Sequence, residues 1–158
     1  MTSSLVLVAA VMFIFALIAI VIGIVLYVIF SISLYKIATN AGLENPWLAW
    51  VPIGDLYLIG KLIKTLKIST YVIPSIEIVL PVAPFVVGFI GRFPIIGSFI
   101  GGLLALANFI LNLFVLNKVY RMYKPDSAVL FTVLSIFLLP IPFIFLAIKD
   151  LIPVEVVD

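Results

Sequence analysis

The strongest constraint on this chain is a run of 31 residues, from Leu5 to Tyr35, that contains no charged side chain. An α-helix rises 1.5 Å per residue, so this run would be about 46 Å long as a helix. The hydrocarbon core of a bilayer is about 30 Å thick, and the run can therefore span it and also tilt or project beyond one face. The run predicts a membrane-spanning helix.

The overall composition also favours a membrane protein. Hydrophobic residues make up 66% of the 158 residues and charged residues 10%, whereas soluble domains average roughly 45–50% and 25%. The chain has no cysteine and no histidine, which excludes disulfides, thiolate chemistry and the commonest general base and metal ligand. Its basic residues lie at the ends of apolar segments, so no nucleic-acid partner is expected. We expect no catalytic, cofactor-binding or metal-binding residues.

The apolar segments predict an all-α, polytopic integral membrane protein that forms a single membrane domain over residues 1–158. About four transmembrane helices are expected, over residues 5–35, 71–91, 95–117 and 128–148. Residues 46–68 are expected to lie at the membrane interface. Within this segment Trp47 and Trp50 favour the headgroup level as interface anchors, and a break at Pro52 and Gly54 suits an interfacial or re-entrant segment better than a span.

The second half of the interfacial segment has the pattern of an amphipathic surface helix. Apolar side chains recur on one side from Leu56 to Leu66, and Lys61, Lys64 and Lys67 lie on the other. The three lysines are expected to be interface anchors that face anionic headgroups. Asp55 opens this helix, and N-capping is its favoured role over ion binding or acid catalysis.

The positions of the basic residues predict a topology. If residues 46–68 stay on one side, seven basic residues are cytoplasmic and only Arg92 and Lys149 are outside. Positive residues favour the cytoplasmic side, so the N-terminus should lie outside. Four full spans would also place the C-terminus outside. The alternative is a final segment that bends at residues 140–142 as a re-entrant hairpin and returns Lys149 to the cytoplasm.

Two helix faces carry most of the polar and small residues of the predicted spans. On the second span these residues are Pro74, Glu77, Pro81, Pro84 and Gly88, and on the third they are Gly97, Gly101, Ala105, Asn108 and Asn112. Both sets follow the helical repeat, and small residues let membrane helices approach closely. We expect the two faces to pack together, either as a structural seam formed by Gly88, Gly97, Gly101 and Ala105 or as a polar path.

Glu77, Asn108 and Asn112 form the candidate intramembrane polar site. Glu77 is expected about two turns inside the second span, where an ionisable side chain is costly and suggests a function. A desolvated carboxyl of this kind could exchange protons or cations. The alternative is an interfacial Glu77 that pairs with a lysine such as Lys67.

Part of the sequence resembles a known group of proteins. The segment Asn45-Pro46-Trp47-x-x-Trp50-x-Pro52-Ile53 follows the first long apolar helix, and the patterns of residues 36–42, 55–61 and 116–142 accompany it. Together they resemble small polytopic bacterial membrane proteins of unknown function. The resemblance covers about half of the chain, which differs in its long N-terminal helix and proline-rich second span. It implies a bacterial cytoplasmic (inner) membrane location and no particular mechanism.

These features favour a non-enzymatic accessory or structural subunit that lies in the lipid bilayer. Its expected partner is another membrane protein or a second copy of itself in a homo-oligomer. The alternative is a small oligomeric transporter or channel whose polar path runs past Glu77, Asn108 and Asn112. A membrane enzyme is the third possibility, and the sequence offers little chemistry for it.

Overall fold

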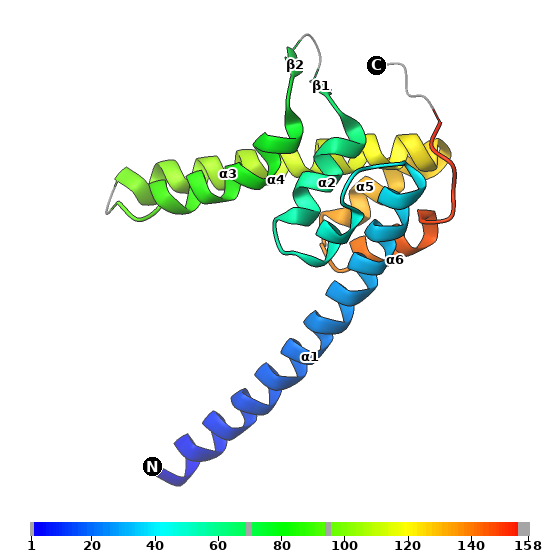
Figure 1. The fold of residues 1–158 in the computed structure, drawn as a ribbon. Coiled ribbons are helices and arrows are strands. Elements are labelled where there is room, and N and C mark those ends of the chain that lie inside the picture. The colour runs from blue at the N-terminus through cyan, green and yellow to red at the C-terminus, as the bar shows by residue number, and fades with distance from the viewer. Residues whose placement is uncertain (1, 69–70, 94–95, 155–158) are drawn as a thin grey trace.

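The computed structural model describes residues 2–68, 71–93 and 96–154, and its fold is mostly helical (Figure 1). The first helix, α1, runs from Thr2 to Asn40 and is longer than the expected span at both ends. The chain turns just after this helix at Gly42, whose φ of +67° lets it reverse. The Leu43 N–H then donates to the Ala38 carbonyl at 2.9 Å. The N-terminal part of α1 extends away from the rest of the molecule (Figure 1).

The interfacial segment folds onto the end of α1. It forms a short 3₁₀ helix, η1 (Pro46–Trp50), followed by α2 (Gly54–Ile63). The apolar side of α2 is buried in the protein core, where it packs against α3 (Ile76–Ile90). The expected amphipathic helix with its apolar side on a membrane surface is therefore wrong. A helix that covers a protein core has the same apolar period as one that lies on lipid.

The expected second span, residues 71–91, is only partly helical. Strands β1 (Leu66–Ile68) and β2 (Tyr71–Ile73) pair antiparallel, with Leu66 opposite Ile73 and Lys67 opposite Val72. Helix α3 begins after this hairpin and has only 15 residues, a length of about 22 Å. The start of the predicted span is thus wrong, because β-branched and aromatic residues before Pro74 pair as a strand instead of continuing the helix.

Helix α4 (Ile96–Tyr123) corresponds to the expected third span and continues beyond its predicted end. Residue 95, where that span was expected to begin, lies outside the described residues. Within the described ranges, two helices are long and apolar enough to cross a membrane: residues Leu5–Asn40 and Phe99–Tyr123. Helices α3 and α4 form a hairpin that extends from the compact part of the molecule in a different direction from α1 (Figure 1).

The expected fourth span is wrong as a single helix. After a 3₁₀ turn, η2 (Pro125–Ser127), the chain forms α5 (Ala128–Ser135), reverses direction, and forms α6 (Ile141–Ile148). Each helix has eight residues and is about 12 Å long. Leu138 has a φ of +60°, and Pro140 and Pro142 follow it. Prolines in this position interrupt the helical hydrogen bonds, which explains the break.

The core lies where the C-terminal third of α1 meets α2, α4 and the α5–α6 pair. Phe145 of α6 is completely buried, with its ring centroid 4.9 Å from that of Phe30 and 6.2 Å from that of Tyr120. Helix α6 packs along α1, and α5 packs along α4. Segments at opposite ends of the chain therefore share one core.

Candidate functional site

Glu77 lies in the first turn of α3, and its side chain is half-buried. Because α3 starts at Ile76, the expected position two turns inside a span is wrong. The backbone of Glu77 rests directly on α2. A Cβ atom built on Gly60 would lie 2.3 Å from the Glu77 Cα and 2.7 Å from its N atom. Only glycine at position 60 permits this approach of the two helices.

Asn108 and Asn112 lie one turn apart on α4. The Asn112 Nδ2 donates to the Asn108 carbonyl at 2.8 Å and lies 3.5 Å from the Asn108 Oδ1. Asn108 also faces an open groove of about 420 Å³ between α3 and α4. The other residues of this groove are apolar: Ile78, Val79, Val82, Ala83, Val86, Val87, Leu104, Ala107 and Leu111. The groove does not contain Glu77, so the structure does not bring the three residues of the expected polar site together there.

The contact between α3 and α4 uses a different face of α3 from the one expected. Gly97 and Gly101 lie at the contact, since added Cβ atoms would be 2.4 Å from the Ile90 carbonyl oxygen and 3.0 Å from the Gly91 Cα, respectively. A Cβ on Gly88 would have no neighbour within 4 Å, and Ala105 is exposed. The expected packing roles of Gly88 and Ala105 are therefore wrong.

The predicted interface anchors lie in three different elements. Trp47 and Trp50 are exposed on η1. Lys61 is on α2, with its Nζ 5.4 Å from the centroid of the Tyr57 ring and 3.8 Å from the Glu44 carboxylate. The other two lysines, Lys64 and Lys67, are exposed but follow α2 instead of lying on it. The five residues do not form one helical face.

Asp55 is the second residue of α2 and not its N-cap, because the helix starts at Gly54. Its Oδ1 accepts a hydrogen bond from the Leu56 N–H at 2.8 Å. Burial raises the pKa of Asp55 above its usual range, and hydrogen bonds from backbone N–H groups partly oppose this rise. The carboxylate therefore serves the first turn of α2, as acidic side chains commonly do at helix N-termini.

The ends of α1, α4 and α6 meet at a charged end of the molecule. The Lys36 ammonium pairs with the Asp150 carboxylate, and the Asn40 Nδ2 donates to the Lys149 carbonyl at 3.2 Å. The Lys36 hydrogen bond lowers the pKa of Asp150 below its usual range. Farther along the tail, the Val154 N–H donates to the Met122 carbonyl at 2.6 Å. The charged end comprises Lys36, Glu44, Lys61, Arg121, Lys124, Lys149 and Asp150.

Sequence reasoning missed the buried hydroxyl groups of the core. The Tyr120 hydroxyl and the Ser135 Oγ are 2.8 Å apart, and Ser135 also donates to the Phe131 carbonyl. Among the described residues, the buried hydroxyls of Tyr27, Ser31 and Tyr123 have no hydrogen-bond partner. A pairing such as Tyr120 with Ser135 depends on how α4 and α5 meet, so a helical repeat in the sequence could not reveal it.

Two of the described ion pairs, Lys36–Asp150 and Lys61–Glu44, join different segments of the chain. Within the described ranges, no group of three or more acidic, histidine or cysteine side chains could hold a metal ion. No family model matches the chain, and comparisons with curated proteins and with solved structures also give no match.

Proposed function

We propose that this chain is a non-enzymatic integral membrane protein that acts as an accessory or structural subunit. Its partner would be another membrane protein or a second copy of itself. The resemblance of the Trp47 region to small bacterial proteins supports a location in the bacterial cytoplasmic membrane.

One observation carries this proposal. Every residue of α1 from Leu5 to Val25 is exposed, although almost all of them are apolar. A bilayer core covers about 20 residues of an upright helix, and the uncharged run has 31. The run from residue 26 onward packs in part into the protein's own core, so the exposed part from Leu5 to Val25 is the part that needs lipid or another protein around it, because exposing it to water is unfavourable. An additional membrane helix would cover one side of this exposed part.

The sequence of α1 offers a face for such a helix. Ala9, Ala16 and Gly23 are spaced seven residues apart, so they lie on the same side of α1. All three are exposed, and a Cβ on Gly23 would have no neighbour within 4 Å. Small side chains allow two membrane helices to pack closely. Inside lipid the hydrophobic effect does not drive helices together, so the van der Waals contacts of this close packing drive their association.

The proposed topology places α1 and α4 across the membrane, with the N-terminus outside, and α3 antiparallel to α4 in the same layer, where its 15 residues cover about 22 Å of a core of about 30 Å. Arg92 lies in the tight turn between α3 and α4, so these two helices must run in opposite directions through the same layer. Helices α5 and α6 are too short to cross it. With the C-terminal tail held at the charged end, eight of the nine basic residues lie on one side and Arg92 alone on the other. This distribution supports a cytoplasmic charged end.

A substitution in the small-residue face of α1 tests the proposed subunit role. We expect Ala16→Leu to abolish or strongly weaken the assembly that the tagged full-length protein forms in mild detergent, because the larger side chain separates the packed helices. Ala10→Leu is the matched control, since residue 10 faces about 100–140° away from the three small residues on the same helix. The assembly would be followed by size-exclusion chromatography with light scattering. A wild-type protein that is monomeric and has no stoichiometric partner would contradict the proposal.

Glu77→Gln separates this function from transport. The substitution keeps the shape of the side chain and removes its titrating charge. We expect normal folding, assembly and cellular phenotype, because Glu77 lies at the start of α3 and outside the α3–α4 groove. Thermal unfolding, assembly size and growth of cells that depend on the protein would be compared with wild type. A variant that folds and assembles normally but loses the phenotype would instead favour a transporter or channel.

A further inference from the structure

We propose that residues 125–150 form a re-entrant hairpin that enters the membrane from the charged end and returns to the same side. The inference rests on the membrane location proposed above and specifies a lipid-contacting surface that this location does not imply. The lipid-contacting surface of the hairpin is the turn between α5 and α6. This turn contacts the hydrocarbon region of the nearer leaflet.

Both ends of the hairpin lie at the charged end. Its first end follows Lys124, the residue after α4. Its second end is held by the Lys36–Asp150 ion pair and by the hydrogen bond from Asn40 to the Lys149 carbonyl. The tail then reaches Met122 near the end of α4, through the Val154 N–H. A chain that has crossed a bilayer could not return to these contacts.

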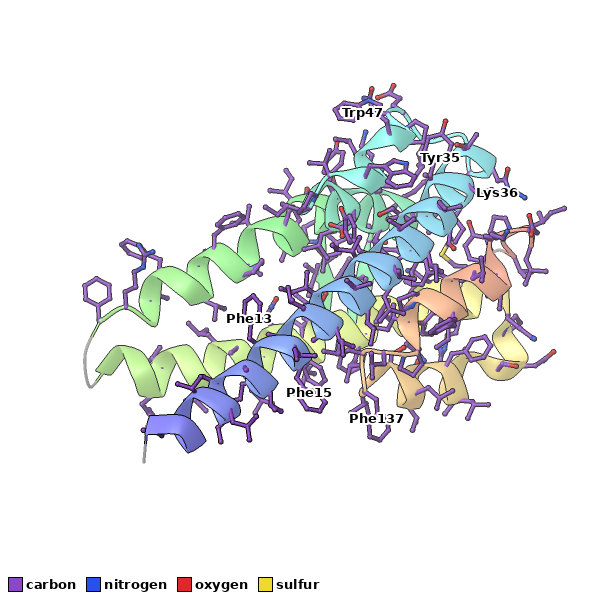
Figure 2. The ribbon with its side chains drawn as sticks, turned by 90° about the horizontal axis from the view of Figure 1, so that it is seen from below. Phe13, Phe15, Tyr35, Lys36, Trp47 and Phe137 are labelled. Atoms are coloured by element: carbon purple, nitrogen blue, oxygen red, sulfur yellow. The ribbon has the colours of Figure 1, made fainter. Side chains whose placement is uncertain are left out.

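The length of each arm limits how deep the hairpin can reach. Helices α5 and α6 have eight residues each and are about 12 Å long, against a hydrocarbon core of about 30 Å. Each helix is therefore too short to reach the far side of the core. In Figure 2 Phe137, in this turn, lies away from Tyr35, Lys36 and Trp47, which are gathered at the opposite side of the view.

The side chains of the turn are unsuited to water. Four consecutive apolar residues are exposed: Ile136 by 48%, Phe137 by 70%, Leu138 by 60% and Leu139 by 63%. In a turn that faced water, such positions would carry polar residues or glycine. If the turn contacts hydrocarbon instead of water, the free-energy cost of exposing these four apolar side chains disappears.

The backbone of the turn is suited to hydrocarbon. The N–H groups of Ile136, Phe137 and Leu138 donate to carbonyls of the last turn of α5, at 3.1–3.2 Å. The N–H groups of Leu139 and Ile141 donate within the turn at 2.7 and 3.1 Å. Residues 140 and 142 are prolines and have no N–H group. From residue 136 to 142 every donor is thus paired or absent, as lipid requires, since it offers no acceptor.

The hairpin is fixed to the rest of the fold by its inner side. The buried ring of Phe145 packs between α1 and α4, and the Ser135 Oγ is within 2.8 Å of the Tyr120 hydroxyl. The side of the hairpin that faces α1 and α4 is therefore covered by protein, and the turn at residues 136–139 is left for lipid.

Cysteine labelling in intact membranes tests the inference, since the natural chain has no cysteine. Single variants Arg121→Cys and Ile152→Cys flank the hairpin, and both positions are exposed. A membrane-impermeant maleimide should label both from the same side. It should react at least tenfold more slowly with Phe137→Cys and Leu139→Cys until SDS is added. Arg92→Cys provides the reference for the opposite side.

Two results would overturn the inference. Labelling of residues 121 and 152 from opposite sides would mean that the segment crosses the bilayer. Labelling of residues 137 and 139 as fast as residue 152 would place the turn in water. If residues 92 and 121 react from the same side, the topology proposed for α3 and α4 fails, whereas the comparison of residues 121 and 152 still decides the hairpin.

Discussion

Alanine at position 60 is expected to destabilise the protein by about 3 kcal/mol or more, at or above the upper end of the usual overpacking cost. The added Cβ would lie 2.3 Å from the Glu77 Cα and 2.7 Å from its N atom, both of which are backbone atoms. No side-chain rotation can relieve this overlap, so α2 and α3 must separate. Each kcal/mol lowers the melting temperature of a domain of this size by about 2–4 °C, and the expected loss is thus about 6–12 °C.

Gly88→Ala is the matched control for Gly60→Ala. Gly88 lies on α3, the helix that Gly60 contacts, and an added Cβ there would have no neighbour within 4 Å. Alanine is a better helix former than glycine, so this variant should unfold at the wild-type temperature or slightly above. Thermal unfolding in detergent, followed by circular dichroism, would measure both. Equal melting temperatures for the two variants would contradict the close contact of α2 with α3.

Phe145→Ala is expected to cost about 3–5 kcal/mol, the usual range for removing a fully buried aromatic ring. Phe145 is 0% exposed, and its ring contacts those of Phe30 and Tyr120. The substitution leaves a cavity between α1, α4 and α6. Phe143→Ala, two residues earlier and 54% exposed, should cost much less. The same unfolding measurement would compare them, and equal losses would show that α6 does not pack in the core as described.

The sequence predicts the helical class of this fold well, because a long apolar run has few stable structures other than a helix. Residues Leu5 to Tyr35 were expected to be helical, and they are part of α1. The third expected span likewise corresponds to α4. The β1–β2 hairpin was not expected, because three-residue strands are too short to show a reliable alternation of apolar and polar side chains.

The packing partners of the helices were less predictable. Helix α3 has two faces with the same helical period, one rich in proline and glycine and one rich in larger apolar residues. The sequence suggested the first face, but Ile76 and Leu80 of the second are buried and Val87 and Ile90 lie beside α4. In the same way, the apolar side of α2 has a pattern that fits lipid and protein equally well. Whether lipid or protein covers the apolar side of a helix depends on the rest of the fold.

The candidate site illustrates the same limit. Glu77, Asn108 and Asn112 were grouped because their helices were expected to pack through one polar seam. Gly60 has a clear role only in the structure, since no local pattern shows that the backbone of Glu77 will pass over it. The bend at Pro140 and Pro142 was visible in the sequence as an alternative. The contacts of Lys36 and Asn40, more than 100 residues from their partners, were not.

The pairing of the first helix with the last has a consequence for biosynthesis. Lys36 and Asp150 are separated by 114 positions, and ribosomes add about 5–20 residues per second. The C-terminal third of α1 therefore waits roughly 6 to 23 s for the residues that complete its environment. During that interval α1 depends on its own hydrogen bonds, on lipid and on the η1 segment that follows it, conditions that a continuous helix with a long uncharged run tolerates. A ribosome that stalled before α6 would leave the C-terminal third of α1 without one of its two main packing partners, as a signal of an unfinished chain for quality-control proteases.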